Sequence, residues 1–115
     1  MWKDDMVFAG HMLDTARRAL AKVRGKERAD FDADENLRLA LTHLLQIIGE
    51  AARRLSLQFR ETHTSIDWKA IIGMRHKVVH DYLNVDEDVV WDTVSRELHP
   101  LVAELEKIVP PDTEN

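Results

Sequence analysis

Apolar residues recur at helical spacing along almost the whole chain. Near the N-terminus they alternate steps of four and three, which predicts a helix with one apolar stripe that ends near Gly25. The stripe consists of Trp2, Met6, Ala9, Leu13, Ala16, Leu20 and Val23. The chain has few glycines and prolines and no strand-like alternation, so a β-sheet is not expected.

A second helix, expected to be the longest, begins at Asp32, where Glu35 three residues later resembles a capping box. Its apolar positions continue to Phe59. Residues 39–48 are apolar on almost every side of the helix, so two of its surfaces need burial. One of these surfaces is a candidate contact with a second subunit.

A third helix is expected to begin at Ser65 or Asp67, either of which can act as its N-cap. It continues through the stretch GMRHKVVHDYLNV, which starts at Gly73. Within that stretch Met74, Val78 and Val79 are expected to pack in the core. The polar residues between them are therefore the ones that need an explanation.

A fourth helix is announced by Asn84 and Asp86 and continues to Leu98. Pro100 should break or kink it, because proline lacks the N–H of a helical hydrogen bond. A short last helix is expected over residues 101–109. The pattern therefore predicts an all-α fold, an antiparallel bundle of four to five helices.

The length of 115 residues leaves room for one domain, 1–115, whose last residues, 110–115, should fray after two prolines. Without cysteine, disulfides and thiolate zinc sites are excluded. The N-terminus carries Asp4 and Asp5 and lacks a long apolar run, so neither a signal peptide nor a membrane span is expected. These features predict a soluble, cytoplasmic protein.

The formal net charge of −5 argues against a general nucleic-acid coat, although it does not exclude a local basic cleft. Basic residues do cluster along the chain. They are Arg17, Arg18, Lys22, Arg24, Lys26 and Arg28, and further on Arg53 and Arg54. Such runs are commonly the solvated faces of helices, and the sequence leaves both interpretations open.

His76 and His80 lie four residues apart, which would place them on one helical face. Two imidazoles are too few for a catalytic zinc, and HKVVH lacks the glutamate of the H-E-x-x-H pattern. We therefore expect no metal site and no cofactor. Of the other histidines only His43 stands out, because it lies in the most apolar segment, where a hydrogen-bonded interface residue is the simpler interpretation.

Arg75, His80 and Tyr82 could not meet on one continuous helix. At 100° per residue Tyr82 lies within about 20° of Arg75, whereas His80 is offset by about 140°. Two copies of the chain around a two-fold axis could combine an arginine and a histidine, so a site here implies a dimer. The alternative is an ordinary amphipathic helix whose polar edge contains these residues.

A histidine and an arginine without a metal can support the cleavage of RNA. The histidine can take the proton from a ribose 2′-hydroxyl, and the arginine can neutralise the charge that gathers on the phosphate. DNA lacks this internal nucleophile and should resist. No glycine-rich phosphate loop is present that would suggest nucleotide hydrolysis.

Two segments, IIGEAARRLS at residues 47–56 and IDWKAIIGMRHKVVHDYLNVDEDVVWDTV at residues 66–94, resemble the HepT-like toxins of the HEPN superfamily. The motif R-x-x-x-x-H-x-Y of that family is matched by Arg75, His80 and Tyr82. The resemblance implies a two-fold dimer of helical bundles that acts on RNA as a metal-independent endoribonuclease through the arginine and histidine. It also implies a partner, a minimal nucleotidyltransferase antitoxin, that modifies the tyrosine with AMP.

Two further residues are candidates for an accessory role. His76 follows the arginine where the family pattern often has asparagine, and its imidazole could share the acid–base work. Glu50 could face the site, or it could simply pair with Arg53 or Arg54. Two other functions stay open: a non-catalytic nucleotide-binding or substrate-binding subunit of a nucleotidyltransferase, and a purely structural helical dimer.

Overall fold

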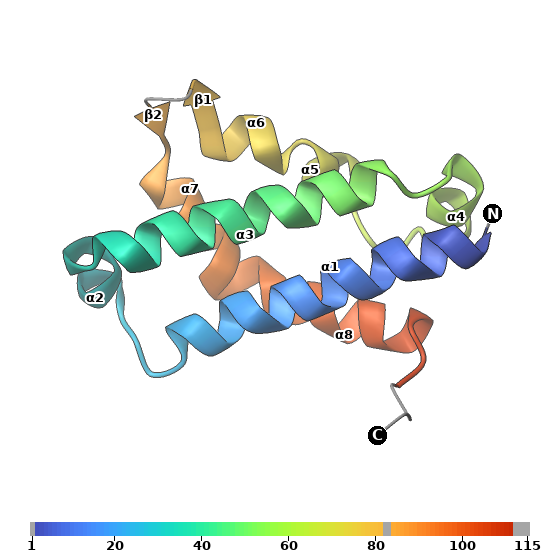
Figure 1. Cartoon of the computed structure of the whole chain (residues 1–115), viewed down its shortest axis with the longest axis horizontal. Helices are drawn as coiled ribbons and strands as arrows, with labels where there is room; N and C mark the ends of the chain where they lie inside the picture. The colour runs from blue at the N-terminus through green and yellow to red at the C-terminus, as the bar shows by residue number, and fades with distance from the viewer. Residues whose placement is uncertain (1, 82–83, 112–115) are drawn as a thin grey trace.

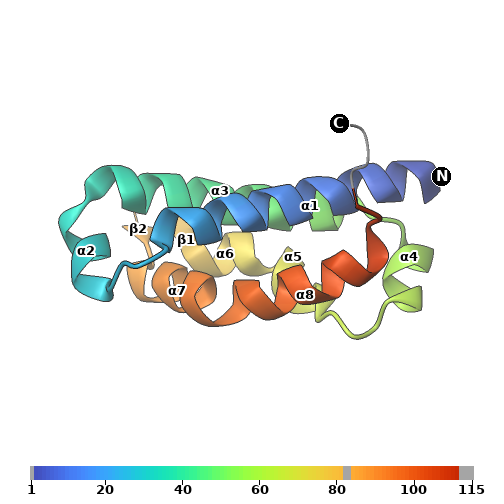
Figure 2. The same cartoon turned by 90° about the horizontal axis from the view of Figure 1, so that it is seen from below.

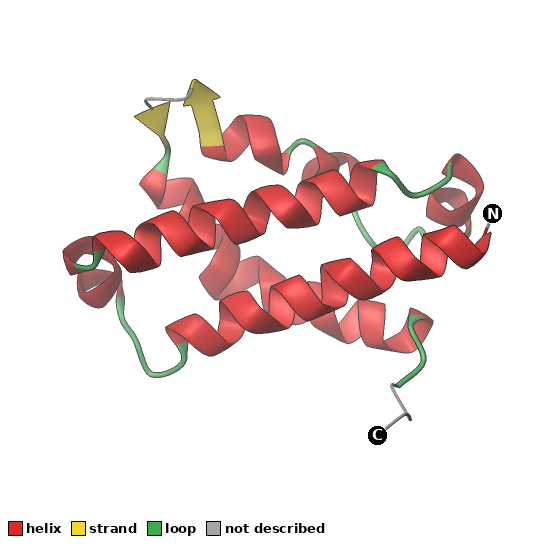
Figure 3. Cartoon of the chain, in the orientation of Figure 1, coloured by secondary structure: helices red, strands yellow, loops and turns green. Residues whose placement is uncertain are grey.

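The computed structural model describes residues 2–81 and 84–111, without the side chains of residues 2, 3, 80 and 81. Its helices are α1 (Trp2–Val23), α2 (Arg28–Ala33), α3 (Glu35–Arg53), α4 (Leu57–Thr62), α5 (Trp68–Ile72), α6 (Met74–Val78), α7 (Glu87–Asp92) and α8 (Leu98–Ile108). Strands β1 (Val79–Asp81) and β2 (Asn84–Val85) follow α6, and a π-helical turn, Thr93–Glu97, joins α7 to α8. The described chain is mainly helical, so the predicted all-α class is confirmed (Figure 3).

The helices form two layers. Helices α1 and α3 lie side by side and run in opposite directions (Figure 1). Seen at a right angle to that view, α5 to α8 lie along their other side (Figure 2). The shortest dimension of the molecule, 21 Å, matches about two helix diameters. None of the helices in residues 2–81 and 84–111 has the length and apolar character needed to cross a bilayer.

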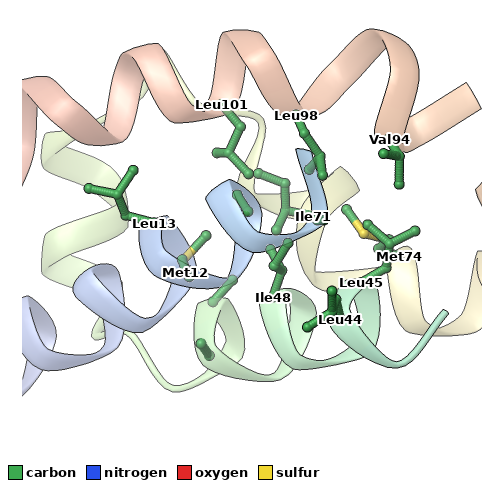
Figure 4. Packing of buried hydrophobic residues seen from close by; sticks show 14 of the residues in the cluster. Met12, Leu13, Leu44, Leu45, Ile48, Ile71, Met74, Val94, Leu98 and Leu101 are labelled. Atoms are coloured by element: carbon green, nitrogen blue, oxygen red, sulfur yellow. The ribbon is translucent and has the colours of Figure 1, made fainter. Parts of the chain in front are cut away.

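One hydrophobic core lies between the layers. Figure 4 shows its side chains converging from α1, α3, α5, α6, the π turn and α8. Helix α1 contributes small residues, including the fully buried Ala9, Ala16 and Ala19, which let it lie close to its neighbours. It ends as predicted, because Gly25 follows with a φ of 74°, a conformation that favours glycine.

A buried carboxylate ties the N-terminal turn of α1 to α4. The side chain of Asp5 is only 4% exposed, and it accepts hydrogen bonds from the backbone N–H and the hydroxyl of Ser56, each at 2.7 Å. The Ser56 oxygen in turn accepts from the N–H of Phe59 as the N-cap of α4. The entry to α4 is therefore fixed by a residue about fifty positions earlier in the chain.

The predicted second helix is wrong at both ends. It begins at Glu35 with Asp34 as its N-cap, because Asp32 belongs to α2, whose own capping box joins Glu27 and Asp30. It ends at Arg53, and Phe59 lies on the separate helix α4. With 19 residues it is shorter than α1, which has 22.

The predicted third helix is also shorter than expected. It is divided at Gly73 into α5 and α6, and α6 ends at Val78 because Val79 adopts an extended conformation with φ −123° and ψ 107°. Strand β1 then pairs with β2 in an antiparallel ladder, which corrects the expectation of no sheet. Met74 and Val78 are buried and Val79 packs against the core, as predicted.

Pro100 does not break the last helix. Residues 87–108 form a continuous helical run, and Pro100 lies in the first turn of α8. The π turn just before it widens the backbone, and the N–H of Leu98 donates to the carbonyl of Thr93. Since a proline ring collides with the carbonyl four residues earlier in a regular helix, the wide turn accommodates it without a break.

Candidate functional site around Arg75

Arg75 lies on α6, which packs closely against α3 at a glycine. A Cβ atom at Gly49 would lie 3.1 Å from the carbonyl oxygen of Ile71 and 3.8 Å from the backbone nitrogen of Arg75. The absence of a side chain at Gly49 therefore sets how near the end of α5, and with it the start of α6, comes to α3. Ile48, Ile71 and Met74 fill the core directly behind this contact (Figure 4).

The close packing brings Arg75 beside Glu50. One guanidinium nitrogen of Arg75 lies 3.6 Å from Glu50 Oε1, and the arginine side chain stays 60% exposed. The same carboxylate accepts a 2.8 Å hydrogen bond from Arg53 Nη2 and a 3.4 Å bond from Arg54 Nε. Three guanidinium groups thus converge on one carboxylate.

The arginines determine the charge state of this carboxylate. The hydrogen bond and charge of Arg53, reinforced by Arg54, hold the pKa of Glu50 below its usual range, although partial desolvation opposes them. The pKa of Arg53 is raised in return. Glu50 is therefore ionised at neutral pH, and it neutralises only part of the positive charge around it.

An open hollow of about 410 Å³ lies over this cluster, and we call it the Arg75 hollow. Its lining residues come from α3 and α6, namely His43, Gln46, Ile47, Glu50, Arg53 and Arg75. His43 and Glu50 are seven residues apart on α3, two helical turns, so both side chains point to the same face. This exposed, partly cationic surface has the size and charge to receive a phosphate group.

Sequence reasoning had connected only part of this cluster. From the sequence, Glu50 could either face the site or pair with Arg53 or Arg54. In the structure the Glu50 carboxylate contacts Arg53, Arg54 and Arg75 together. The contributions of His43 and Gln46 were not foreseen. Their spacing of seven and four residues before Glu50 is the signal that could have indicated them.

The remaining motif residues are placed only in part. His80 lies in β1, with its side chain outside the described part of the chain, and Tyr82 lies outside the described residues altogether. The angular comparison of Arg75, His80 and Tyr82 assumed one helix through residue 82, and this premise is wrong, since α6 ends at Val78. His76 is exposed on α6 and has no side-chain hydrogen bond or ion pair with any described residue.

No group of three or more metal-binding side chains lies together anywhere in the part of the chain that the structure describes. The chemistry visible around Arg75 is instead that of guanidinium groups and a carboxylate. Guanidinium groups bind and neutralise phosphate oxygens, since their planar N–H donors match the geometry of the anion.

Comparison with known proteins adds a family context to this site. A family model described as "Ribonuclease HepT-like" matches residues 12–108. A protein of Caldanaerobacter subterraneus subsp. tengcongensis named "Putative RNase TTE0752" is 35% identical over 102 residues, which cover 89% of this chain and 91% of that protein. A protein of Thermococcus cleftensis named "Probable ribonuclease HepT" is 35% identical over 79 residues, or 69% of this chain and 72% of the relative. No solved structure matches the chain.

Proposed function

Because the chain belongs to the Ribonuclease HepT-like family, we propose that it is the metal-independent endoribonuclease toxin of a toxin–antitoxin system. The observation that carries the proposal is the exposed guanidinium of Arg75, which lines the Arg75 hollow beside Glu50. In the sequence Arg75 lies five residues before His80. Arg75 and His80 are the proposed catalytic residues.

The proposed reaction is an internal transfer at phosphorus. His80 removes the proton from the ribose 2′-hydroxyl, and the 2′-oxygen forms a bond to phosphorus while the bond to the 5′-oxygen breaks. Arg75 binds the phosphate oxygens and neutralises the charge that develops on them. A protonated histidine returns a proton to the departing 5′-oxygen, so the products are a 2′,3′-cyclic phosphate and a 5′-hydroxyl.

We propose that the cleavage site is completed by a second copy of the chain. The exposed face of α3 that leads into the Arg75 hollow carries Leu39, which is 61% exposed, and then His43, Gln46 and Glu50. An exposed leucine beside polar residues suits the centre of a two-fold contact, where both copies present the same surface. Such a pairing brings two copies of Arg75 and His80 toward one cleft.

We propose further that a minimal nucleotidyltransferase antitoxin neutralises the toxin by transferring AMP to Tyr82. The phenol oxygen attacks the α-phosphorus of ATP, pyrophosphate leaves, and the phenolic proton is lost to a base of the partner. Tyr82 lies two residues after His80 in the sequence, and a bulky anionic nucleotide there would repel the phosphates of RNA. We expect both reactions to take place in the cytoplasm.

The nuclease is tested with purified protein and single-stranded RNA in the presence of EDTA. Wild type should cleave, Arg75→Ala should lose about 10²-fold or more in kcat/KM, and His80→Ala should lose a similar factor. Lys77→Ala is the matched control, since Lys77 is an exposed cation of the same helix that lines a different hollow with Asp67 and Lys69. Absence of cleavage by wild type, with both site variants as toxic in cells as wild type, would overturn the proposal.

The modification is tested separately. Incubation with the partner enzyme and ATP should add AMP to wild type and to Arg75→Ala, and it should not add AMP to Tyr82→Phe. Equal labelling of Tyr82→Phe would refute the assignment. Nucleotide binding by calorimetry without any RNA cleavage would favour a non-catalytic subunit instead.

A further inference from the structure

A second groove, of about 520 Å³, lies between α1 and α3 and meets the Arg75 hollow. The two depressions share Ile47 and Glu50 as lining residues. The other side chains of this α1–α3 groove are Phe8, His11, Asp14, Thr15 and Arg18 of α1, with Ala51 and Arg54 of α3 and its C-cap. A ligand bound at Arg75 can therefore extend across α3 toward α1.

The α1–α3 groove and the Arg75 hollow are lined by more basic than acidic side chains, although the protein has a net negative charge. Four arginines, Arg18, Arg53, Arg54 and Arg75, line the two depressions against the carboxylates of Asp14 and Glu50. Arg18 is exposed and has no ion pair with any residue in the described ranges. Its charge is thus free to meet an anion, which sets it apart from the neighbouring Arg17, whose Nη2 lies 2.6 Å from Glu106.

An aromatic group lies beside these charges. The ring of Phe8 is half-buried, and the guanidinium carbon of Arg54 lies 6.0 Å from its centre. The imidazole of His11 lies edge-on to the same ring, at 6.3 Å between ring centres. Flat aromatic faces next to arginine are what proteins use to stack the bases of single-stranded nucleic acid and to hold its phosphates.

We propose that the α1–α3 groove is a subsite for single-stranded RNA, in which a base next to the scissile phosphate stacks on Phe8 and its own phosphate binds Arg18 and Arg54. The inference rests on the proposed ribonuclease function of Arg75. It assigns a role to one member of the basic run, Arg18, which lines the groove, whereas the neighbouring Arg17 pairs with Glu106. The groove should therefore bind single-stranded RNA without preference for a particular base, since any base can stack on an aromatic ring.

The test measures the affinity of the full chain for a fluorescein-labelled 2′-O-methyl RNA dodecamer, which lacks the nucleophile and stays intact. Arg18→Ala should weaken binding about threefold to tenfold and reduce the slope of log affinity against log salt by about 0.7. Phe8→Leu keeps the apolar packing and should weaken binding about fivefold. Arg17→Ala removes the same charge from the adjacent position and should leave affinity within about twofold of wild type.

The outcomes separate this inference from the function it rests on. If wild type cleaves RNA while Arg18→Ala and Phe8→Leu bind and cleave as Arg17→Ala does, the subsite is refuted and the nuclease stands. If Arg18→Ala and Phe8→Leu instead change the oligomeric state in size-exclusion chromatography, the groove is a subunit contact and the inference falls. If wild type neither binds nor cleaves RNA, both proposals fail.

Discussion

Replacement of Gly49 by alanine tests whether the contact between α3 and α6 limits both stability and activity. The new methyl group would lie 3.1 Å from the Ile71 carbonyl oxygen, so α5 and α6 must retreat by a few tenths of an ångström. Overpacking of this kind costs about 1–3 kcal/mol, and the better helix propensity of alanine returns about 1 kcal/mol. The net loss is about 1 kcal/mol, or roughly 4 °C in melting temperature for a domain of this size.

Activity should respond more strongly than stability. The group that must give way, the carbonyl of Ile71, lies four residues before Arg75 on the adjoining helix, so the shift of α5 is passed on to Arg75. Since about 1 Å of misplacement can cost 10²-fold, a shift of a few tenths should lower kcat/KM about threefold to tenfold. Cleavage of RNA is measured beside thermal unfolding to compare the two effects.

Gly10→Ala provides the matched control. Gly10 also lies inside a long helix, α1, but nothing lies within 4 Å of a Cβ built there. This variant should gain up to about 1 kcal/mol from helix propensity and cleave RNA as wild type does. If Gly49→Ala were stabilised as much as Gly10→Ala, or if it cleaved RNA at the wild-type rate, the close approach could not be what positions Arg75.

Two other predictions concern buried and partly buried carboxylates. Because the folded-state pKa of Glu50 is lowered, its ion pairs stabilise the fold above the usual glutamate pKa and are lost as pH falls through the folded value. The difference in melting temperature between wild type and Glu50→Gln should therefore be present at neutral pH and shrink as the pH falls through the acid range; a difference that stayed constant over that range would contradict this assignment. Asp5→Ala should cost about 2–4 kcal/mol in urea unfolding, because two hydrogen bonds from Ser56 lose a buried acceptor. Asp4→Ala, at an exposed position next to it, should stay within about 0.5 kcal/mol of wild type, and equal losses for both would refute the role of the buried bond.

The helices were predictable from sequence wherever an apolar stripe and a terminating residue agree. Helix α1 satisfies both conditions, since its stripe stops at Val23 and Gly25 follows in a left-handed conformation. The break between α3 and α4 could not be predicted from the apolar pattern, because helical spacing continues through Ala51, Leu55 and Phe59. The deciding signal was Ser56, whose capping role depends on a carboxylate distant in the sequence.

The end of α6 was missed for a different reason. Two adjacent valines at 78 and 79 fit a buried helix as well as a strand, and β-branched residues favour the extended form only slightly. The outcome depends on pairing with β2, and on the N–H of Asp86, which donates to the carbonyl of Val78 at 2.7 Å. Tertiary contacts of this kind cannot be deduced from periodicity.

The site was predictable as a set of residues but not as an arrangement. The motif indicated Arg75, and the neighbouring sequence indicated Glu50, yet these two lie 25 positions apart and meet only because α6 crosses α3 at Gly49. The three arginines around Glu50 also show how a chain that is acidic overall can present a cationic surface, as the proposed binding of RNA requires. The local charge balance near Arg75 is opposite in sign to the net charge.

The π turn before Pro100 has a consequence for how the length of the chain can vary. A wide turn holds one residue more than a regular α-helix needs, so the flanking segments keep their buried faces, with Val90 on one side and Leu101 and Leu105 on the other. Removal of one residue there would restore regular pitch, provided that the proline were replaced as well, since its ring would then meet a carbonyl. Removal of one residue within α8 would instead rotate all that follows by about 100° and expose Leu105. The Thr93–Glu97 turn is thus the position along this helical run where the loss of one residue is compatible with the buried faces on both sides.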